Sequence, residues 1–487
     1  MNHLGKLSVT SDASTILREV EVSHPAAKLM VHAANAQDAE VGDGANFVIT
    51  LSGELIGNAE ALLLDGLTAA EIVEGYEKAG EKCIAVLESL VVEGSDKFDA
   101  RDVEQVTWRI RGAVSSKQYG YSDFLCKQIA EACVAVCPEN PKSFNVDNVR
   151  VVKLPGGGSL DSLVVKGIVL QSTPKGNILR VKDTKVAVYS QGLDSGNTET
   201  KGTTLFRSAA ELEAYSNDEE ALLEKTVAAI AQTGVKLVVS GGSIGEMALH
   251  YFQRYKMMVL KIGSKFELRR FCRVSGASAI SKFQAPTVDQ IGFVQSCAVE
   301  EIGGAKVTRV EQSDALSSVC SIVIRGAAEN SLDEIERCVD DGVNAYKVLC
   351  QDPRVVLSNG GVEKELAKRI RAFGNQLHGL DQHSVSAYAD ALDAIPKLLA
   401  ENACQEDTNE VSSSPSIPAA GADAATGDAA DASPASPTLM QEGVVYDLYR
   451  TKHRGIKHAT EAALAVLSVD QIIMSKPAGG PQPPKRG

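Results

Sequence analysis

The sequence predicts a multidomain protein of the α/β class, in which a helical body built from both chain ends carries a separate α/β module from the middle of the chain. Three observations support this prediction. The chain has 487 residues, whereas a single hydrophobic core rarely grows beyond about 250. Amphipathic helical patterns dominate both flanks. Short β-rich runs alternate with helical patterns in the middle.

The first flank contains a long amphipathic helix, predicted over residues 68–90. Its apolar residues recur at steps of three and four, which places them on one helical face: Ile72, Tyr76, Ala79, Cys83, Val86 and Leu90. Thr68 followed three residues later by Glu71 predicts a capping box at the start of this helix. A similar helix is predicted over residues 458–467 in the second flank.

The middle of the chain has a different pattern. Strands are predicted over residues 185–189, 236–239, 257–262 and 319–324, and helices over residues 209–215 and 219–232. This alternation is typical of an α/β module.

Two segments lack the apolar residues that a packed core needs. Residues 412–438 are rich in Ala and Pro and contain no aromatic residue, Lys or Arg, so we expect a disordered insertion. Residues 476–487 are rich in Pro and Gly, and we expect a flexible tail.

Composition argues against several classes of partner. The net charge of −14 opposes nonspecific binding to nucleic acid or to an anionic membrane surface. No uninterrupted apolar run of about 18 residues and no signal-peptide pattern occurs, so we expect a cytoplasmic protein. Ten Cys are too sparse for a disulfide scaffold. Cys133 and Cys137 are four apart in an apolar stretch, and we expect buried thiols rather than metal ligands.

The motif Gly42-Asp43-Gly44 stands just before an apolar run and has two interpretations. An isolated motif of this kind is usually only a turn. Alternatively, backbone N–H groups at the start of a following helix hold phosphate oxygens while the Asp carboxylate binds Mg²⁺.

The segments that accompany this motif favour the second interpretation, because together they resemble group II chaperonins in content and in order. They are residues 6–17, 41–46, 115–120, 387–396, 399–403 and 456–463. Five further segments resemble one subunit type of the eukaryotic cytosolic chaperonin: residues 145–149, 199–202, 248–251, 339–344 and the start of the tail at 476–481.

This resemblance implies a subunit with three domains. The equatorial domain would comprise residues 1–98 and 358–487, the intermediate hinge domain residues 99–167 and 328–357, and the apical, client-binding α/β domain residues 168–327. It also implies a hetero-oligomer of two stacked rings of eight different subunits, which folds client proteins such as actin and tubulin with energy from ATP.

The resemblance further implies the site residues for ATP or ADP and Mg²⁺. Asp43 would bind Mg²⁺. Phosphate would be held by the backbone of five residues: Gly42, Asp43, Gly44, Ala45 and Asn46. Asp12 would help orient the attacking water, and Glu334 would occupy the position of the family's hydrolytic Asp as the second catalytic residue. The remaining nucleotide contacts would come from Ser116, Lys117, Gln118, Gly360 and Asp447.

Several positions depart from the family pattern. Family members have a helix and a Gly-Pro phosphate loop ahead of the segment that starts here at Lys6, and this sequence has no room for either, which predicts an N-terminal truncation. Ala45 replaces a Thr, and Glu334 replaces an Asp, with Asp333 one residue earlier. Residues 357–361 read Leu-Ser-Asn-Gly-Gly in place of Pro-Gly-Gly-Gly-Ala. The alternative hypothesis is therefore a structural ring subunit that does not hydrolyse ATP, or a truncated product that does not assemble.

Overall fold

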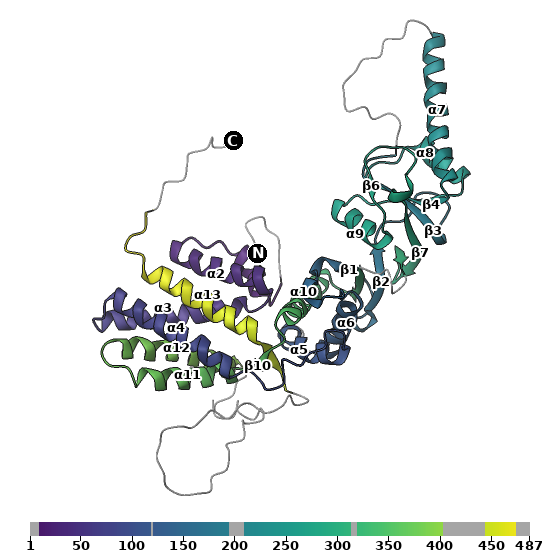
Figure 1. Cartoon of the computed structure of the whole chain (residues 1–487). Helices are drawn as coiled ribbons and strands as arrows, with labels where there is room; N and C mark the ends of the chain where they lie inside the picture. The colour runs from purple at the N-terminus through teal and green to yellow at the C-terminus, as the bar shows by residue number, and fades with distance from the viewer. Residues whose placement is uncertain (1–8, 118–119, 194–208, 313–318, 403–443, 474–487) are drawn as a thin grey trace. The chain divides into compact units, whose positions relative to one another are not determined.

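The computed structural model describes residues 9–117, 120–193, 209–312, 319–402 and 444–473. The chain divides into two compact units (Figure 1). Unit 1 comprises Met1–Lys97 and Asp352–Gly487, and unit 2 comprises Phe98–Gln351. The predicted disordered insertion, the predicted tail and Gln118 lie outside the described residues.

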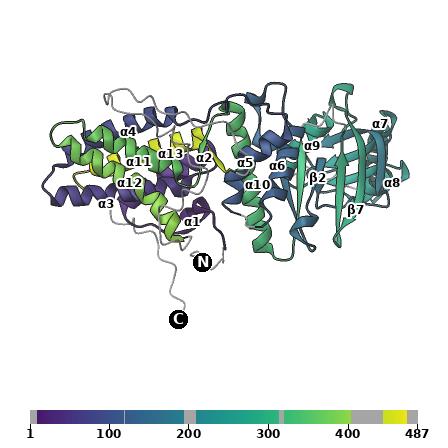
Figure 2. The ribbon, with the colours of Figure 1, turned by 90° about the horizontal axis from the view of Figure 1, so that it is seen from below.

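Unit 1 is a bundle of long helices joined from both chain ends (Figures 1 and 2). Its elements are α1 Ala13–Glu19, α2 Pro25–Val41, α3 Ala45–Leu64, α4 Ala69–Ser89, α11 Gly361–Gly374, α12 Asp381–Asn402 and α13 Tyr449–Leu467, with a short antiparallel ribbon of β10 Val355–Leu357 and β11 Tyr446–Leu448. Its core includes fully buried residues of α3, α4, α12 and α13.

The predicted helix over residues 68–90 is confirmed as α4. Thr68 accepts a bond from the N–H of Glu71, and the Glu71 carboxylate accepts from the N–H of Thr68 at 2.8 Å, which completes the capping box. The predicted helix over residues 458–467 is too short, because α13 begins nine residues earlier at Tyr449. Its polar first turns are held by buried contacts that the apolar pattern does not reveal.

Unit 2 contains three helices side by side and a nine-stranded mixed sheet. The helices are α5 Val103–Ser115, α6 Ser122–Ala135 and α10 Glu329–Gln351 (Figure 2). The strands are β1 Val149–Pro155, β2 Leu163–Leu170, β3 Arg180–Tyr189, β4 Val235–Ser240, β5 Met258–Lys261, β6 Ala279–Ile280, β7 Gly292–Ile302, β8 Ala305–Glu311 and β9 Cys320–Gly326. They run in the order β1-β9-β2-β8-β7-β3-β4-β5, and β6 pairs with β3.

Helices cover both faces of the β3-β4-β5 part of the sheet. Val186 and Val188 share a core cluster with α9 Lys265–Ser275, whereas the alternate residues Ala187 and Tyr189 share another with α7 Ala209–Gln232 and α8 Glu246–Arg254. The α/β character predicted for the middle of the chain is confirmed. The two helices predicted over residues 209–232 form one continuous helix, α7, because the residues between them contain no Gly or Pro to break it. The finer division into intermediate and apical domains remains a prediction.

All nine described cysteines are free thiols, and no group of three or more potential metal-ligating side chains occurs among the described residues.

By length and composition, α3 is the one described helix that could cross a membrane. Val48, Leu51 and Leu55 on α3 are fully buried in unit 1, so we interpret α3 as a core helix.

Two helical glycines of unit 1 give a matched test of this packing. A Cβ on Gly75 of α4 would lie 2.3 Å from Ser384 Cβ on α12, whereas a Cβ on Gly57 of α3 would meet no atom within 4 Å. We expect Gly75→Ala to lower the free energy of unfolding by about 1–3 kcal/mol, because the added methyl group would push α4 and α12 apart. Gly57→Ala should raise it by up to about 1 kcal/mol through helix propensity. Urea unfolding followed by circular dichroism would measure both, and equal effects of the two variants would contradict this packing.

Candidate functional site

The turn between α2 and α3 contains the Gly42-Asp43-Gly44 motif. Gly42 and Gly44 both have the left-handed conformation, with φ of 78° and 83°, which favours glycine. The Asp43 carboxylate accepts a bond from the N–H of Gly44 at 2.7 Å. Gly44 is the N-cap of α3 and supplies no side-chain cap.

The start of α3 therefore has the features of an anion site. The N–H groups at the start of an α-helix have no partner within the helix, and the helix dipole adds partial positive charge there. In α3 no capping side chain accepts from these groups. The loss of the family's Thr at Ala45 leaves the backbone donor in place, because only a side-chain hydroxyl is missing.

A buried amide fixes this turn against α13. Gln37 on α2 is fully buried, and its Nε2 donates to the carbonyl of Asp43 at 3.0 Å and to the carbonyl of Thr451 at 3.2 Å. Sequence reasoning missed Gln37. A polar residue one helical turn before a glycine turn is the only feature that could have indicated it.

Asp447 lies in a buried group of charges. The ammonium of Lys452 is 3.1 Å from the Asp447 carboxylate and 2.6 Å from that of Glu363. It also lies 4.7 Å from the ring centre of Phe47 in α3. The side chains of Lys452 and Glu363 are only 15% and 1% exposed. Burial by itself lowers the pKa of Lys452, but the charges of Glu363 and Asp447 outweigh it and hold this pKa above its usual value.

Gly360 is the N-cap of α11 and lies in a crowded left-handed turn. Its φ is 78°, and that of the preceding Asn359 is 60°. A Cβ on Gly360 would lie 3.2 Å from Pro396. Asn adopts this conformation more readily than most residues with a side chain, so the departure at Asn359 is compatible with the turn. Gly360 also provides no side-chain cap for α11.

Asp12 is the N-cap of α1. Its carboxylate accepts bonds from the N–H groups of Ser14 and Thr15 at 3.3 and 3.1 Å and from the Thr15 hydroxyl at 2.6 Å. The Ser14 hydroxyl also donates to Asp38 on α2 at 3.2 Å. Asp12 therefore caps α1, and the bond from Ser14 links α1 to α2.

The remaining predicted site residues belong to unit 2. Ser116 is the C-cap of α5, and its hydroxyl donates to the carbonyl of Ala113 at 2.8 Å. The next residue, Lys117, forms an ion pair with Asp341 on α10, and both side chains are nearly buried.

The carboxylates at the predicted hydrolytic position are paired with cations. Glu334 lies 3.1 Å from the guanidinium of Arg337, and Asp333 lies 2.6 Å from the ammonium of Lys153. Asp341 contacts the predicted nucleotide residue Lys117 and stands two helical turns after Glu334 on the same helix. Sequence reasoning missed Asp341. Its position within a polar run, Val-Asp-Asp-Gly, hides the fact that this side chain points inward.

The predicted residues thus form two groups. In unit 1, bonds through Gln37 and Lys452 connect the Gly42–Gly44 turn with Asp447 and with the start of α11, which Gly360 caps. In unit 2, Lys117 is joined to Asp341. The arrangement in unit 1 offers backbone donors at the start of α3 and the Asp43 carboxylate beside them. Those are elements that bind a phosphorylated ligand together with a metal ion.

Comparison with known proteins gives consistent matches along the chain. A model of the TCP-1/cpn60 chaperonin family matches residues 1–477. T-complex protein 1 subunit theta of Arabidopsis thaliana is 48% identical over 99% of this chain and 87% of that protein. The subunit theta proteins of Dictyostelium discoideum and Homo sapiens are each 44% identical, over 100% and 99% of this chain and 90% and 88% of their own lengths. The resemblance deduced from the motifs is confirmed, including the single subunit type that five segments indicated.

Lys452 provides a direct test of the buried charge group. We expect Lys452→Met to lower the free energy of unfolding by about 3 kcal/mol, because it leaves two carboxylates without their shared cation. Lys457→Met is the matched control. Lys457 is exposed and lies 3.8 Å from Glu461, and its loss should change stability by less than about 0.5 kcal/mol.

Chemical denaturation of the full chain would measure both variants. Adding Glu363→Gln to Lys452→Met should recover part of the loss, because it removes one of the stranded charges. A double variant no more stable than Lys452→Met alone would contradict the proposed coupling.

Proposed function

The chain belongs to the TCP-1/cpn60 chaperonin family, and on that basis we propose that it is a theta-type subunit of a cytosolic hetero-oligomeric chaperonin that folds other proteins with energy from ATP. Its partners would be the other subunits of a double ring and unfolded clients such as actin and tubulin. It would act in the cytoplasm.

The start of α3 is the observation that carries the nucleotide part of this proposal. Its uncapped backbone donors would hold phosphate oxygens, and the adjacent Asp43 would bind Mg²⁺. Asp447 and Gly360 would border the nucleotide. When bound, Mg²⁺ would neutralise phosphate charge, which is a main part of catalysis in phosphoryl transfer.

Hydrolysis would also require a carboxylate that orients water, and we consider three candidates. We proposed Asp12 and Glu334 from the family pattern. Asp12 is occupied as a helix cap, and Glu334 is paired with Arg337. We add Asp341, because it is nearly buried and contacts Lys117, which the family pattern assigns to the nucleotide. By the same family pattern, Ser116 and Gln118 would also contact the nucleotide.

The competing function is a ring subunit that binds nucleotide without hydrolysing it. The observation that favours it is that Asp333, Glu334 and Asp341 are all paired with cations, which restricts their access to a water molecule. The two functions make opposite predictions for cleavage of the γ-phosphate.

Photo-crosslinking in the assembled complex separates binding from hydrolysis. After the subunits are separated on a denaturing gel, an azido-ATP labelled at the α-phosphate marks this subunit's band when this subunit has bound it. The same probe labelled at the γ-phosphate loses its label from that band only when this subunit hydrolyses it. We expect α-label on the wild-type subunit. Asp43→Asn should reduce it about tenfold or more, because a metal-binding carboxylate is lost. Asp65→Asn at the far end of α3 is the control and should leave it unchanged.

The γ-label distinguishes the carboxylates. We expect Asp341→Asn to retain both labels, with hydrolysis slowed about 100-fold or more, and Glu334→Gln to hydrolyse like the wild type. The reverse pattern would assign the role to Glu334. A wild-type subunit that keeps its γ-label would establish the non-hydrolysing function, and one without α-label would refute the nucleotide site.

A further inference from the structure

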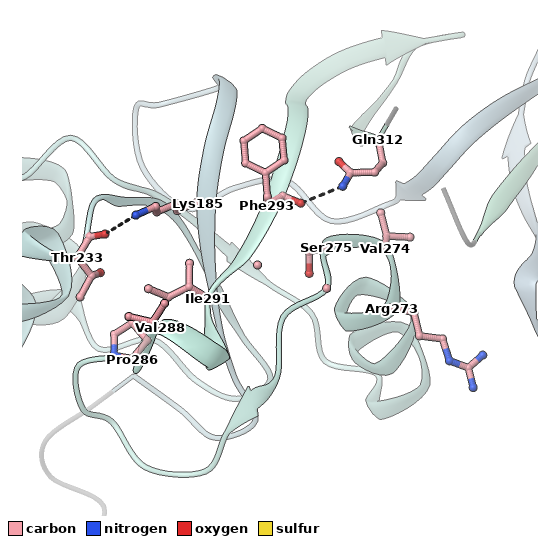
Figure 3. Close-up of a pocket in the computed structure, with 12 residues that line it drawn as sticks. Lys185, Thr233, Arg273, Val274, Ser275, Pro286, Val288, Ile291, Phe293 and Gln312 are labelled. Carbon is pink, nitrogen blue, oxygen red and sulfur yellow. Dashed lines mark hydrogen bonds between the residues drawn. The ribbon is translucent and has the colours of Figure 1, made fainter. Parts of the chain in front are cut away.

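A cavity of about 600 Å³ lies in unit 2, where the end of α9 meets the start of β7 (Figure 3). Its lining is mainly apolar, from Val274, Pro286, Val288, Ile291 and Phe293. Val274 is almost fully buried, whereas Val288 and Phe293 are 86% and 43% exposed. The cavity therefore has an apolar floor and an apolar mouth that opens to solvent. Its volume is within the range of small-molecule sites.

Glycines at two positions shape this cavity. A Cβ on Gly292 would lie 2.4 Å from the carbonyl oxygen of Ser275, so only glycine lets β7 start this close to the end of α9. Gly276 ends α9 with a φ of 68°, and a Cβ there would meet no atom within 4 Å. The backbone thus forms part of the wall, and open space remains next to it.

Lys185 is the cation available at this cavity. Its ammonium is 3.5 Å from the carbonyl oxygen of Thr233, which is a long contact. Among the described residues no carboxylate lies within ion-pair distance of Lys185, and none lines the cavity. Arg273 also lies at the edge, but Figure 3 shows its guanidinium directed away from the centre. That group donates to Asn148 at 3.1 Å.

The other polar groups of the lining are satisfied within the protein. The Gln312 amide donates to the carbonyl of Phe293 at 3.2 Å and accepts from the N–H of Gln295 at 3.2 Å. The Ser275 hydroxyl donates to the carbonyl of Phe271 at 2.8 Å. Within the part of the chain that the structure describes, a ligand would therefore meet apolar surface and a single ammonium group that lacks a counter-ion.

We propose that this cavity binds an amphipathic carboxylate, with its apolar chain against Val274, Ile291 and Phe293 and its carboxylate at Lys185. A charge-assisted bond to Lys185 would replace the long contact to Thr233. A single cation suits a singly charged head group better than a phosphate ester. This site is independent of the proposed nucleotide site, since its residues take no part in it.

Calorimetric titration of the full chain with decanoate tests the proposal. We expect saturable binding with one site. Decylammonium and decanol share the apolar chain but lack the anion, and each should bind about tenfold more weakly or worse. Equal binding of decanoate and decylammonium would overturn the role of Lys185, and the absence of saturable binding of decanoate would overturn the site.

Variants locate the binding. Lys185→Gln should weaken decanoate binding about tenfold, and Lys185→Arg should retain most of it. Lys182→Gln, three residues earlier on β3 and outside the lining, is the matched control. Phe293→Ala should weaken binding several-fold, whereas Leu179→Ala, an exposed apolar residue outside the lining, should not.

Thermal unfolding of each variant shows whether it is folded. Decanoate binding by Lys185→Gln equal to that of the wild type, or equal losses in Lys185→Gln and Lys182→Gln, would contradict the site. Nucleotide labelling should be unaffected by Lys185→Gln, so failure of this proposal is distinguishable from failure of the proposed function.

Discussion

The buried ammonium of Lys452 is the constraint on which unit 1 depends. A charge removed from water is costly unless opposite charges and hydrogen bonds surround it, and here they come from Glu363 on α11 and Asp447 on β11. The aromatic ring of Phe47 on α3 provides a further favourable contact. Phe47 precedes the other three residues by more than 300 positions, so the first helices cannot complete the bundle without the last ones.

This constraint determines the geometry of the candidate site. With α13 held by Lys452, the carbonyl of Thr451 is fixed, and Gln37 ties it to the Gly42–Gly44 turn. Gly44 of this turn is the N-cap of α3, so the helix starts without a side-chain cap. α4 shows the contrast, because its capping box has side-chain acceptors for the N–H groups of Thr68 and Glu71. The start of α4 is thus capped by side chains, whereas the start of α3 remains available to an anion.

Local patterns predicted much of this fold, because they report local physics. The capping box of α4, the mixed helical and α/β character and the family resemblance all follow from residue spacing and motifs. The start of α13 was predicted too late, because residues 450–454 are polar and their burial depends on distant carboxylates. The roles of Gln37 and Asp341 were missed for the same reason: a polar side chain in a helix looks solvent-exposed until its tertiary partners are known. The left-handed conformation of Asn359 could likewise not be read from its sequence neighbours.

The most direct test of the central claim, that the start of α3 holds nucleotide phosphate, is hydrogen exchange at the first-turn amides of α3. We expect Mg²⁺ and ADP to slow exchange at Ala45, Asn46 and Phe47 by about tenfold or more, because phosphate oxygens would accept from these groups. Exchange at the first turn of α4, which the Thr68 capping box already satisfies, should not change. Equal exchange of the α3 amides with and without nucleotide would contradict the account.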